Sequence, residues 1–586
     1  MDGSATPVAS PGDPVDSPGD RRPFAAASPA MSSAELPGAG RLGRRSFLAG
    51  AGAASLAGLG GSLLLGGCST GTSARTSQPL PSSAGLPPKH GGSLHVGTTS
   101  EIDSFSPFSG HWDNTGLTYA NTIYDTLTAI AADGSAKPYL AQSVTPNPEH
   151  TLWTITLRPG VLFHDGTPLD ASVLVKNIEA FLGSPLTGPA LSPIAGARVV
   201  GPLAVEVSCK EPLVAFPYYL STQVGVVVAP SMIDPPAGAA PRPVGTGPFV
   251  YESWVPNAHF SATRNPRYWR KGLPYLDRVT YLPIVDDTAR LDSLLSGSIG
   301  LMVSTNPDVL LKLRSSRSYR LVDTLQRSVG EPDMDFIMLN TVVPPTNDIT
   351  VRRALARALD VRALIKLFDA GLTQPSTGLF PPGSPYYAPT GYPTYDLAAA
   401  KALVREAEAR HGGRISLELA TIPSSREVLA TQAIQSMWQA AGVDVTLAQV
   451  DQATLITNAL EGHFQAYTWE QFSAPDPDLN YVWWSTTTLA PVGSIALNFA
   501  RNDDPLIQAA LQRGRENADP SVRVAAYRTV NERLAADLPY LWLSRTIWSA
   551  AASADVAGFD GGRLPGGEAA ESFAGGVLSP VQVWLS

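Results

Sequence analysis

The chain has 586 residues, of which 44% are hydrophobic and 16% charged, and its formal net charge is −9. A chain of this length is expected to divide into two or three domains. Gly and Pro, at 52 residues each, stay below the share that indicates disorder throughout. The acidic balance argues against a nucleic-acid-binding protein, for which a basic surface is expected.

The N-terminal region carries targeting signals rather than a folded domain. Residues 1–40 are rich in Pro, Ser, Ala, Gly and Asp without periodicity, so we expect a disordered leader. Residues 41–67 place Arg44 and Arg45 before a moderately apolar run, which is typical of an export signal peptide. The paired arginines resemble a twin-arginine signal, and Leu-Gly-Gly-Cys, ending at Cys68, resembles a lipobox whose cysteine is lipidated. The alternative is a transmembrane anchor that is retained whole.

The two cysteines of the chain do not form a disulfide framework. We expect residues 68–90 to be a lipidated Cys68 followed by a flexible Ser/Thr/Gly/Pro tether. Cys209 is then left without a partner, and it is expected to act as a small buried hydrophobe.

A strand, a turn and a helix are predicted between residues 151 and 181. Apolar and polar residues alternate over 153–158, which is the period of a strand with one buried face. Pro159 and Gly160 favour a turn, so 161–163 is predicted as the second strand of a hairpin. Asp170 is placed to cap a helix. The apolar residues of that helix recur at helical spacing: Leu174, Ile178 and Phe181.

The same stretch resembles a known family. From Leu157 the sequence reads LRPGVLFHDGTPLDASVLVKN, which is similar to the signature of the extracellular solute-binding proteins of the peptide/nickel ABC-transporter family, family 5. Further segments resemble that family over residues 92–559, with no internal repeat. These segments are 121–127, 138–141, 244–249, 264–269, 336–359 and 469–478.

The resemblance implies an α/β fold like that of periplasmic binding proteins. Two lobes with mixed β-sheets would be hinged around a central cleft, and the first lobe would be discontinuous with an extra subdomain. Lobe I would comprise 91–125, 245–335 and 540–586. The extra subdomain would span 126–244 and lobe II would span 336–539.

Local patterns predict several elements within these lobes. Strands are expected at 92–96 and 336–341, and Asp348 is placed to cap the helix that follows. Further on, a strand at 415–419, a helix that ends at Gly442 and a strand at 443–450 form a β-α-β unit, which favours a partly parallel sheet.

No motif for catalysis or for a metal is present. The histidines are scattered, and the spacing of His90 and His95 is at most a weak metal pattern. The Gly-Thr-Gly-Pro turn at 245–248 lacks the Lys of a phosphate-binding loop. Asp476 and Asp478 lie between prolines and are expected to be capping and turn residues. We therefore expect no catalytic residue, no metal and no cofactor.

The resemblance implies that the ligand chamber is built from the loop after the first strand and from the Trp…Asp-Pro-Asp element. Carried over by position, the expected ligand-binding residues are His111, Trp112, Asp113, Asn114, Asn340, Thr341, Trp469, Glu470, Phe472, Ser473, Asp476 and Trp483.

The resemblance also bears on the solute. Peptide-binding members of the family place an Asp, which pairs with the free α-amino group of the peptide, between the Trp and the Asp-Pro of this element. Here the matching position holds Ser473 or Phe472, and Glu470 is a possible substitute. A buried ammonium without that anion is costly. A blocked or modified peptide, or a non-peptide solute such as an oligosaccharide, is therefore expected to bind better than an ordinary peptide.

Together these features predict a monomeric, lipid-anchored solute-binding protein on the outer face of the cytoplasmic membrane. Its partners would be a small peptide or peptide-like solute, an ABC permease, and the lipid bilayer through acylated Cys68; nucleic acid would not be one. Two alternatives are a binding protein for a non-peptide solute (an oligosaccharide or a metal chelate) and a binding lipoprotein that works without a transporter. A secreted hydrolase has no catalytic motif to support it.

Overall fold

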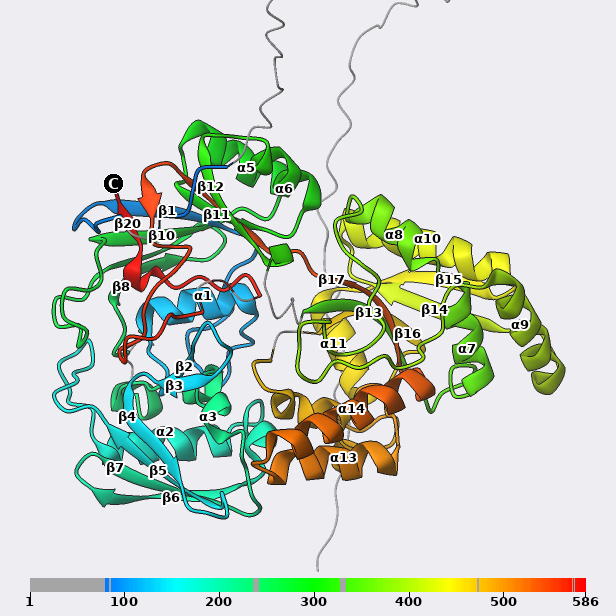
Figure 1. Ribbon diagram of the computed structural model, residues 1–586, viewed down its shortest axis with the longest axis horizontal. Helices are drawn as coiled ribbons and strands as arrows, with labels where there is room; N and C mark the ends of the chain where they lie inside the picture. Colours follow the sequence, from blue (N-terminus) through cyan, green and yellow to red (C-terminus); the bar gives the residue numbers. More distant parts are fainter. Residues whose placement is uncertain are drawn as a thin grey trace, which may run out of the picture. The chain divides into compact units, whose positions relative to one another are not determined.

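The computed structural model describes residues 79–83, 86–235, 242–326, 333–471, 474–571, 573 and 575–586 (Figure 1). The predicted leader, export signal and lipidated Cys68 lie outside the described residues, as do Phe472 and Ser473. Within the part of the chain that is described, no helix is both long and apolar enough to cross a membrane.

A seven-stranded sheet is assembled from distant parts of the chain, in the order β12-β18-β11-β1-β10-β9-β8. β1 pairs in parallel with β10 and β11, whereas the remaining pairs are antiparallel. The strands are β1 (Ser93–Thr98), β8 (Phe249–Val255), β9 (His259–Arg264), β10 (Arg278–Pro283), β11 (Leu301–Ser304), β12 (Tyr319–Asp323) and β18 (Ser549–Ser553). The helices of this part are α1 (Asn114–Ile123), α5 (Asp287–Ser296) and α6 (Pro307–Arg314).

A four-stranded antiparallel sheet, ordered β4-β5-β7-β6, lies in the chain between α1 and β8. Its strands are β4 (Ala141–Pro146), β5 (Leu152–Leu157), β6 (Ile194–Gly201) and β7 (Ala204–Cys209). The smaller elements around it are β2 (Thr128–Ile130), β3 (Ala136–Pro138), α3 (Phe216–Tyr219) and α4 (Pro230–Ile233). α2 (Ala171–Gly183) packs on this sheet, and the side chain of Asp170 accepts hydrogen bonds from the backbone N–H groups of Ser172 and Val173, as predicted.

The predicted hairpin over 153–163 is wrong. β5 is a central strand, and it pairs with β4 on one side and with β7 on the other. Residues 161–163 contribute only an isolated bridge between Leu162 and Pro168. One partner, β4, precedes β5, and the other, β7, follows about fifty residues later, so the turn at Gly160, whose φ is +75°, does not lead into a paired strand.

A five-stranded sheet, ordered β15-β14-β16-β13-β17, forms the remaining part. Its strands are β13 (Met334–Leu339), β14 (Ser416–Thr421), β15 (Asp444–Gln449), β16 (Ala466–Gln471) and β17 (Tyr540–Arg545). Its helices are α7 (Ile349–Ala358), α8 (Val361–Phe368), α9 (Leu397–His411), α10 (Ser425–Ala441), α11 (Gln452–Glu461), α12 (Tyr481–Trp484), α13 (Pro505–Glu516) and α14 (Pro520–Asp537). The short pair β19 (Val556–Ala557) and β20 (Trp584–Leu585) follows.

The predicted β-α-β unit is confirmed. β14 and β15 pair in parallel, and α10 connects them. α10 ends at Gly442, whose φ of +105° is the left-handed conformation that glycine tolerates best. Asp348 accepts a hydrogen bond from the N–H of Thr350 and so caps α7, also as predicted.

Each part has its own hydrophobic core. β13 is buried on both faces: Phe336 and Met338 belong to one buried cluster, and Ile337 and Leu339 to another. A strand that is covered on both faces requires a continuous apolar run, and 336–339 provides it.

The chain crosses between the two large sheets at two places that touch. The backbone N–H of Thr546 donates to the carbonyl of Asp333 at 3.1 Å, and the indole N–H of Trp548 donates to the Asp333 carboxylate at 3.0 Å. Because β17 pairs with β13, the second crossing lies after Arg545 rather than at residue 540. With that boundary moved, the division into two lobes and a subdomain stays a proposal.

Candidate functional site

A pocket of about 300 Å³ lies where the three parts of the molecule meet. α1 contributes Asn114, Leu117 and Asn121, and the inserted subdomain contributes Ser221 and Thr222. The loop after β16 adds Ala474 and Pro475, and much of the remaining wall comes from residues 558–582. We take this central pocket as the candidate site because residues from every part of the molecule line it. A larger pocket of about 560 Å³ has no lining residue from the five-stranded part.

Asn121 is a candidate site residue that the sequence analysis missed. It lines the central pocket, it is half-buried, and its side-chain amide has no hydrogen-bond partner among the described residues. Asn114, Leu117 and Asn121 are three and four residues apart, which places them on one face of α1. That spacing could have shown that Asn121 shares the face of the predicted Asn114.

The segment 111–114 is placed mainly by contacts within lobe I. Asp113 caps α1 and also accepts a hydrogen bond from Ser100 at 2.9 Å, and burial raises the pKa of its carboxyl. The Trp112 indole donates to the carbonyl of Ser104, and exposed His111 contacts Asp103. Asn114 is different, because it lines the central pocket and donates to the Asp333 carboxylate at 3.1 Å.

Two further predicted residues, Asn340 and Thr341, lie at the far end of β13 from the crossing. The Asn340 amide donates to the carbonyl of Gly462 at 2.9 Å, and the Thr341 hydroxyl contacts the carbonyls of Ala500 and Arg501. Neither residue lines the central pocket. The structure therefore does not bring them together with Asn114.

Two of the predicted aromatic residues, Trp469 and Trp483, belong to one aromatic group. Trp469 and Trp483 both pack on Phe499, with ring centroids 5.4 and 5.1 Å away. Neither tryptophan lines the central pocket. Glu470 lies opposite Asp335 on the neighbouring strand and accepts a hydrogen bond from Thr546 at 3.0 Å. Burial, together with the nearby Glu470, raises the pKa of Asp335 well above its usual value.

The Asp-Pro-Asp carboxylates bind arginines of α13 and α14. Asp476 is 2.5 Å from a terminal guanidinium nitrogen of Arg523, and Asp478 is 3.0 Å from Nε of Arg515. Burial raises the pKa of Asp476, while the Arg523 charge counteracts this. Both aspartates also fix the local turn, since Asp476 accepts a hydrogen bond from the N–H of Asp478. These contacts agree with the expectation that they are capping and turn residues.

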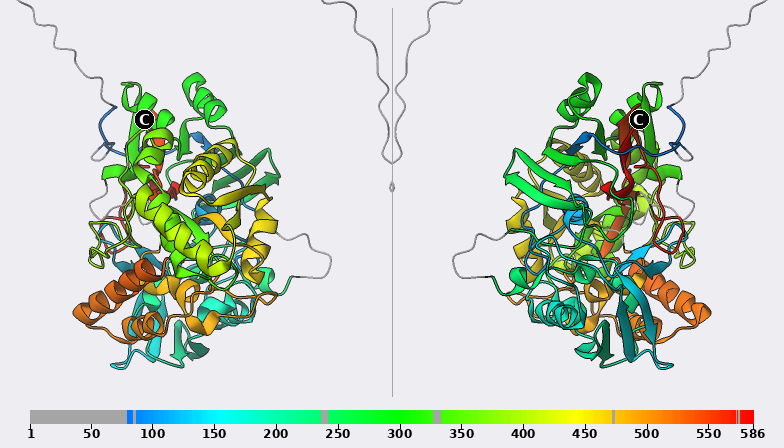
Figure 2. Two further views of the ribbon diagram at one scale, coloured as in Figure 1. Left: turned by 90° about the vertical axis from the view of Figure 1, so that its right-hand side faces the viewer. Right: turned by 90° about the vertical axis from the view of Figure 1, so that its left-hand side faces the viewer.

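Arg515 connects the part that holds the five-stranded sheet to the part that holds the four-stranded sheet. Its guanidinium contacts Glu211 at 3.1 Å, and its backbone carbonyl accepts from the N–H of Val214. The Tyr219 hydroxyl donates to the Asp478 carboxylate at 3.0 Å. α13 and α14 accordingly lie beside the subdomain in both orientations of the molecule (Figures 1 and 2). The two walls of the central pocket are thus held together by a buried polar cluster.

The remaining signature segments converge on Asp125. This buried carboxylate accepts hydrogen bonds from Thr246 at 3.0 Å, Tyr268 at 3.0 Å and Trp269 at 2.8 Å. Burial raises its pKa, and the three donors oppose that shift. Asp125 lines the central pocket, but both of its oxygens are already engaged. The family segments 121–127, 244–249 and 264–269 are therefore parts of one structural network.

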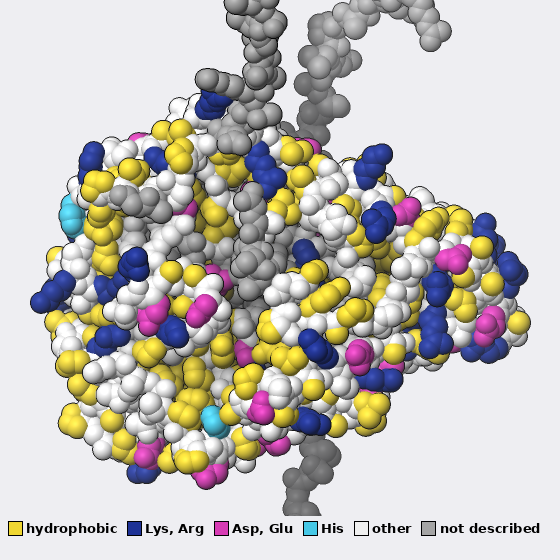
Figure 3. All heavy atoms as spheres, in the orientation of Figure 1, with side chains coloured by type: hydrophobic (Ala, Val, Ile, Leu, Met, Phe, Trp, Pro, Cys, Tyr) yellow, Lys and Arg dark blue, Asp and Glu magenta, His cyan; other side chains and the backbone are white. Residues whose placement is uncertain are grey.

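No metal site or reactive thiol emerges from the described part of the chain. No group of three or more His, Cys, Asp or Glu side chains there is arranged to hold a metal ion. Cys209 is half-buried rather than buried, and burial raises the pKa of its thiol to about 11. Lys, Arg, Asp and Glu are interspersed over the face seen in Figure 3, which lacks the basic patch of a nucleic-acid-binding surface.

Comparison with known proteins identifies the family. Residues 135–490 match the model of bacterial extracellular solute-binding proteins, family 5 Middle. This match covers more than half of the chain, so the chain belongs to the extracellular solute-binding proteins of family 5.

Individual relatives bind different solutes. The chain is 29% identical over 325 residues to the glutathione-binding protein GsiB of Salmonella paratyphi A, which covers 53% of this chain and 60% of that protein. It is 26% identical over 468 residues to the nickel-binding periplasmic protein of Escherichia coli K12, which covers 76% and 88%. The chain thus spans less than two thirds of the glutathione-binding relative.

The fold matches solved periplasmic binding proteins. The ABC transporter-associated protein DppA of Helicobacter pylori, in complex with the peptide STSA, superposes with a TM-score of 0.74 at 22% identity. The match covers 85% of this chain and 98% of DppA. It confirms the predicted α/β architecture of the periplasmic-binding-protein type.

Proposed function

We propose that this chain is a lipid-anchored extracytoplasmic protein that captures a small peptide-like solute and delivers it to an ABC importer. It would act as a monomer and without catalysis. The observation that carries the proposal is the central pocket, which lobe I, the subdomain and lobe II line together. A solute in that pocket would contact all three parts, so its binding would favour the closed arrangement. Family membership supports the general role, and residues 41–68 support export and anchoring.

The chemistry of the pocket favours a small polar solute. A volume of about 300 Å³ is at the lower end of ligand pockets in proteins. Asn114, Asn121, Ser221 and Thr222 offer amide and hydroxyl groups, which suit the peptide bonds of a short or modified peptide. Asp125 is already saturated by three donors and is poorly placed to bind an ammonium group. We therefore keep the expectation that a blocked peptide binds better than one with a free α-amino group.

Calorimetry with matched peptides tests this proposal. Di- to tetrapeptides with free and with N-acetylated amino termini would be titrated into the purified protein. We expect saturable binding that favours the acetylated series. We also expect Asn121→Ala to weaken it about tenfold, equivalent to one lost hydrogen bond in a closed site. Gln439→Ala, an exposed amide on α10, is the matched control and should bind like the wild type.

Two other results would point to a different kind of solute. Tight binding that disappears on acetylation would show that the site binds an amino group. The carboxylates to test would then be Glu571, which lines the central pocket, and Glu470, the substitute expected from the sequence. Absence of binding to either series would rule out short peptides. Native mass spectrometry of the protein from its own host would then show whether an oligosaccharide or a metal chelate occupies the cleft.

A further inference from the structure

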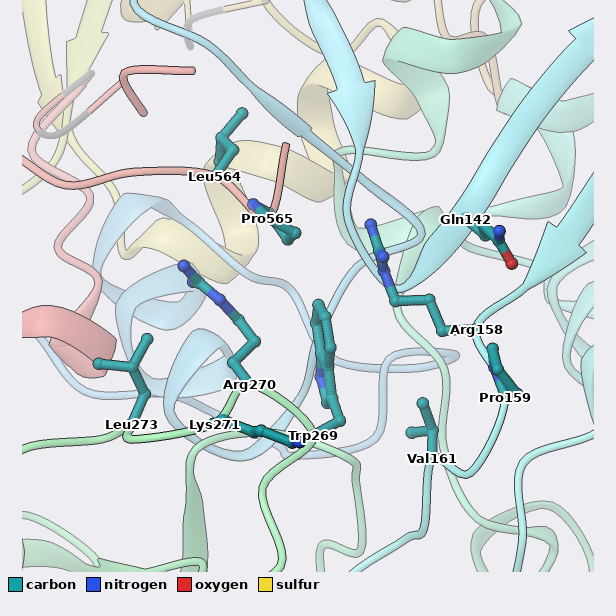
Figure 4. A pocket seen from close by; sticks show the side chains of 10 residues that line it. All are labelled: Gln142, Arg158, Pro159, Val161, Trp269, Arg270, Lys271, Leu273, Leu564 and Pro565. Carbon is teal, nitrogen blue, oxygen red and sulfur yellow. The ribbon is translucent and has the colours of Figure 1, made fainter. Parts of the chain in front are cut away.

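The larger pocket, of about 560 Å³, is lined by three cations and no carboxylate (Figure 4). The cations are Arg158, just after β5, and Arg270 and Lys271, in the loop after β9. Lys271 is exposed, whereas the two arginines are half-buried. Partly buried cations are normally paired with acids. Among the described residues, neither arginine forms an ion pair, and both use neutral acceptors.

One tyrosine fixes the positions of both guanidinium groups. Arg158 Nε donates to the main-chain carbonyl of Tyr139 at 2.6 Å, and Arg270 donates to the hydroxyl of the same residue at 3.2 Å. A second nitrogen of Arg270 donates to the carbonyl of Arg563 at 2.7 Å. The nearest carboxylate along this network is Asp125, which Tyr139 reaches only through Tyr268. The charge of Asp125 attracts Arg270 without an ion pair forming between them, so among the described residues no carboxylate contacts either guanidinium group directly.

An indole ring separates the two arginines. The guanidinium carbon of Arg158 lies 5.2 Å from the centre of the Trp269 ring, and that of Arg270 lies 5.5 Å from the centre of the Tyr139 ring. Figure 4 shows the Trp269 side chain standing between the two arginine side chains. Stacking on aromatic rings holds a guanidinium in a defined orientation, which lowers the entropy lost on binding an anion.

The positive charges of Arg158 and Arg270 also repel each other. Burial, and after it the charge of Arg270, lowers the pKa of Arg158. A ligand that carried negative charge to both groups would relieve this repulsion. A single compact anion would reach only one side of Trp269, whereas an elongated ligand could reach both.

We propose that this pocket, the arginine pocket, binds a small organic dianion whose two oxyanion groups contact Arg158 and Arg270 while its spacer lies along Trp269. The arginine pocket is distinct from the central pocket in its lining, apart from Arg270 and Leu564, which line both. It would give the protein a second ligand, which carries two negative charges, in addition to the peptide-like solute of the central pocket.

A series of dicarboxylates of increasing length tests this inference. Malonate, succinate, glutarate and adipate carry the same charge and differ only in their spacer, and acetate is the monoanion control. We expect calorimetry at low salt to give submillimolar binding that is strongest at one length, and at least tenfold weaker binding of acetate. Binding should also weaken severalfold at 0.15 M salt, because the pocket is open to solvent.

Variants assign the binding to the pocket. Arg158→Gln should lower the affinity for the best dicarboxylate at least tenfold, and Arg158→Lys should restore only part of it. Arg317→Gln removes an exposed arginine elsewhere and should change nothing. If Arg158→Gln does not fold, Lys271→Glu at an exposed position is expected to weaken binding instead.

Three results would contradict this proposal. They are no saturable binding of any dicarboxylate up to 10 mM, equal affinity for acetate, or affinities that neither Arg158→Gln nor Lys271→Glu alters. Asn121→Ala, which affects the central pocket, should leave dicarboxylate binding intact. Failure of the arginine pocket can thus be told apart from failure of the proposed peptide site.

Discussion

The hydroxyl of Tyr219, on α3, donates a hydrogen bond of 3.0 Å to the carboxylate of Asp478, in the turn after β16. Both side chains are buried, and Asp478 is also bound by Arg515. This contact joins two parts that β-sheet pairing does not connect. It is therefore a place where the contact between these two parts can be weakened without changing a residue that lines the central pocket.

Replacing that tyrosine tests the contact. Tyr219→Phe removes only the hydroxyl, and a hydrogen bond to a charged group contributes about 1.5–3 kcal/mol. We expect urea unfolding to show a loss in this range, and small-angle scattering to show a larger radius of gyration without solute. Tyr395→Phe, at a position that is 48% exposed, is the control and should change neither quantity. An unchanged radius of gyration would mean that this contact does not hold the parts together.

Substitution of Asp125 should lower the free energy of unfolding more than substitution at most other positions. An asparagine there can replace only one of the two oxygens that accept from Thr246, Tyr268 and Trp269. At least one buried donor is then left unsatisfied, so Asp125→Asn is expected to lower the free energy of unfolding by about 2–3 kcal/mol. Asp292→Asn on the exposed face of α5 should have almost no effect. Equal stability of the two variants would contradict the network.

His164 should make stability depend on pH. Its Nδ1 accepts a hydrogen bond from the N–H of Gly245, and its Nε2 donates one to the carbonyl of Gly247. A second proton would have to bind to Nδ1, where it would point at the N–H of Gly245. Burial lowers the pKa of His164 to about 4. An unfolded histidine titrates at about 6.5, so between these values the unfolded state binds the extra proton.

The free energy of unfolding should accordingly fall as the pH decreases from about 6.5 to 4, and the contribution of His164 is at most about 3 kcal/mol. The stabilisation is complete above pH 6.5. His164→Gln keeps one donor and cannot titrate, so its denaturation midpoints should vary less over this range. His90→Gln, at an exposed position, should retain the wild-type slope. Parallel curves for all three proteins would refute the assignment.

Anchoring is predicted to depend on Cys68. A single acyl chain gives only marginal membrane binding, on the order of 10⁴ M⁻¹, so stable attachment requires the several chains that a lipobox cysteine receives. Cys68→Ala should leave an uncleaved precursor or release the protein, as membrane fractionation and immunoblotting would reveal. Cys209→Ala is the matched control and should stay at the membrane. Normal processing of the Cys68 variant would exclude it as the anchor.

Export is predicted to depend on the arginine pair. Changing Arg44 and Arg45 to lysine conserves charge but removes the twin-arginine pattern, so the precursor should accumulate in pulse-chase experiments. Arg21→Lys with Arg22→Lys, in the leader, is the charge-matched control. Unaltered maturation of the first variant would argue for a different export route.

Local rules predicted local structure well. The caps Asp170 and Asp348 and the stop at Gly442 were visible in the sequence because each is decided within a few residues of its helix. The pairing of β5 was not, because β7 is separated from it by α2 and β6. Register between distant strands depends on tertiary packing, which a local pattern does not contain.

The candidate site was predicted only in part, for the same reason. Asn114 could be placed from the loop that follows the first strand, and it lines the central pocket. Whether Asp476 is available to a ligand could not be predicted, because the arginine that binds its carboxylate, Arg523, is 47 residues away on α14. Asn340 is likewise satisfied by Gly462, which only the folded chain brings near.

Much of the wall of the central pocket comes from residues 558–582, far along the chain from the family segments. Gly558, Phe559 and Gln582 line the pocket together with Asn114 of the first helix. Translation must therefore reach Gln582 before a complete pocket exists. A nonsense mutation at the codon of Asp560 should be as harmful to the cell's use of this protein as one at the codon of Asn340, and purifying selection should extend over residues 558–582.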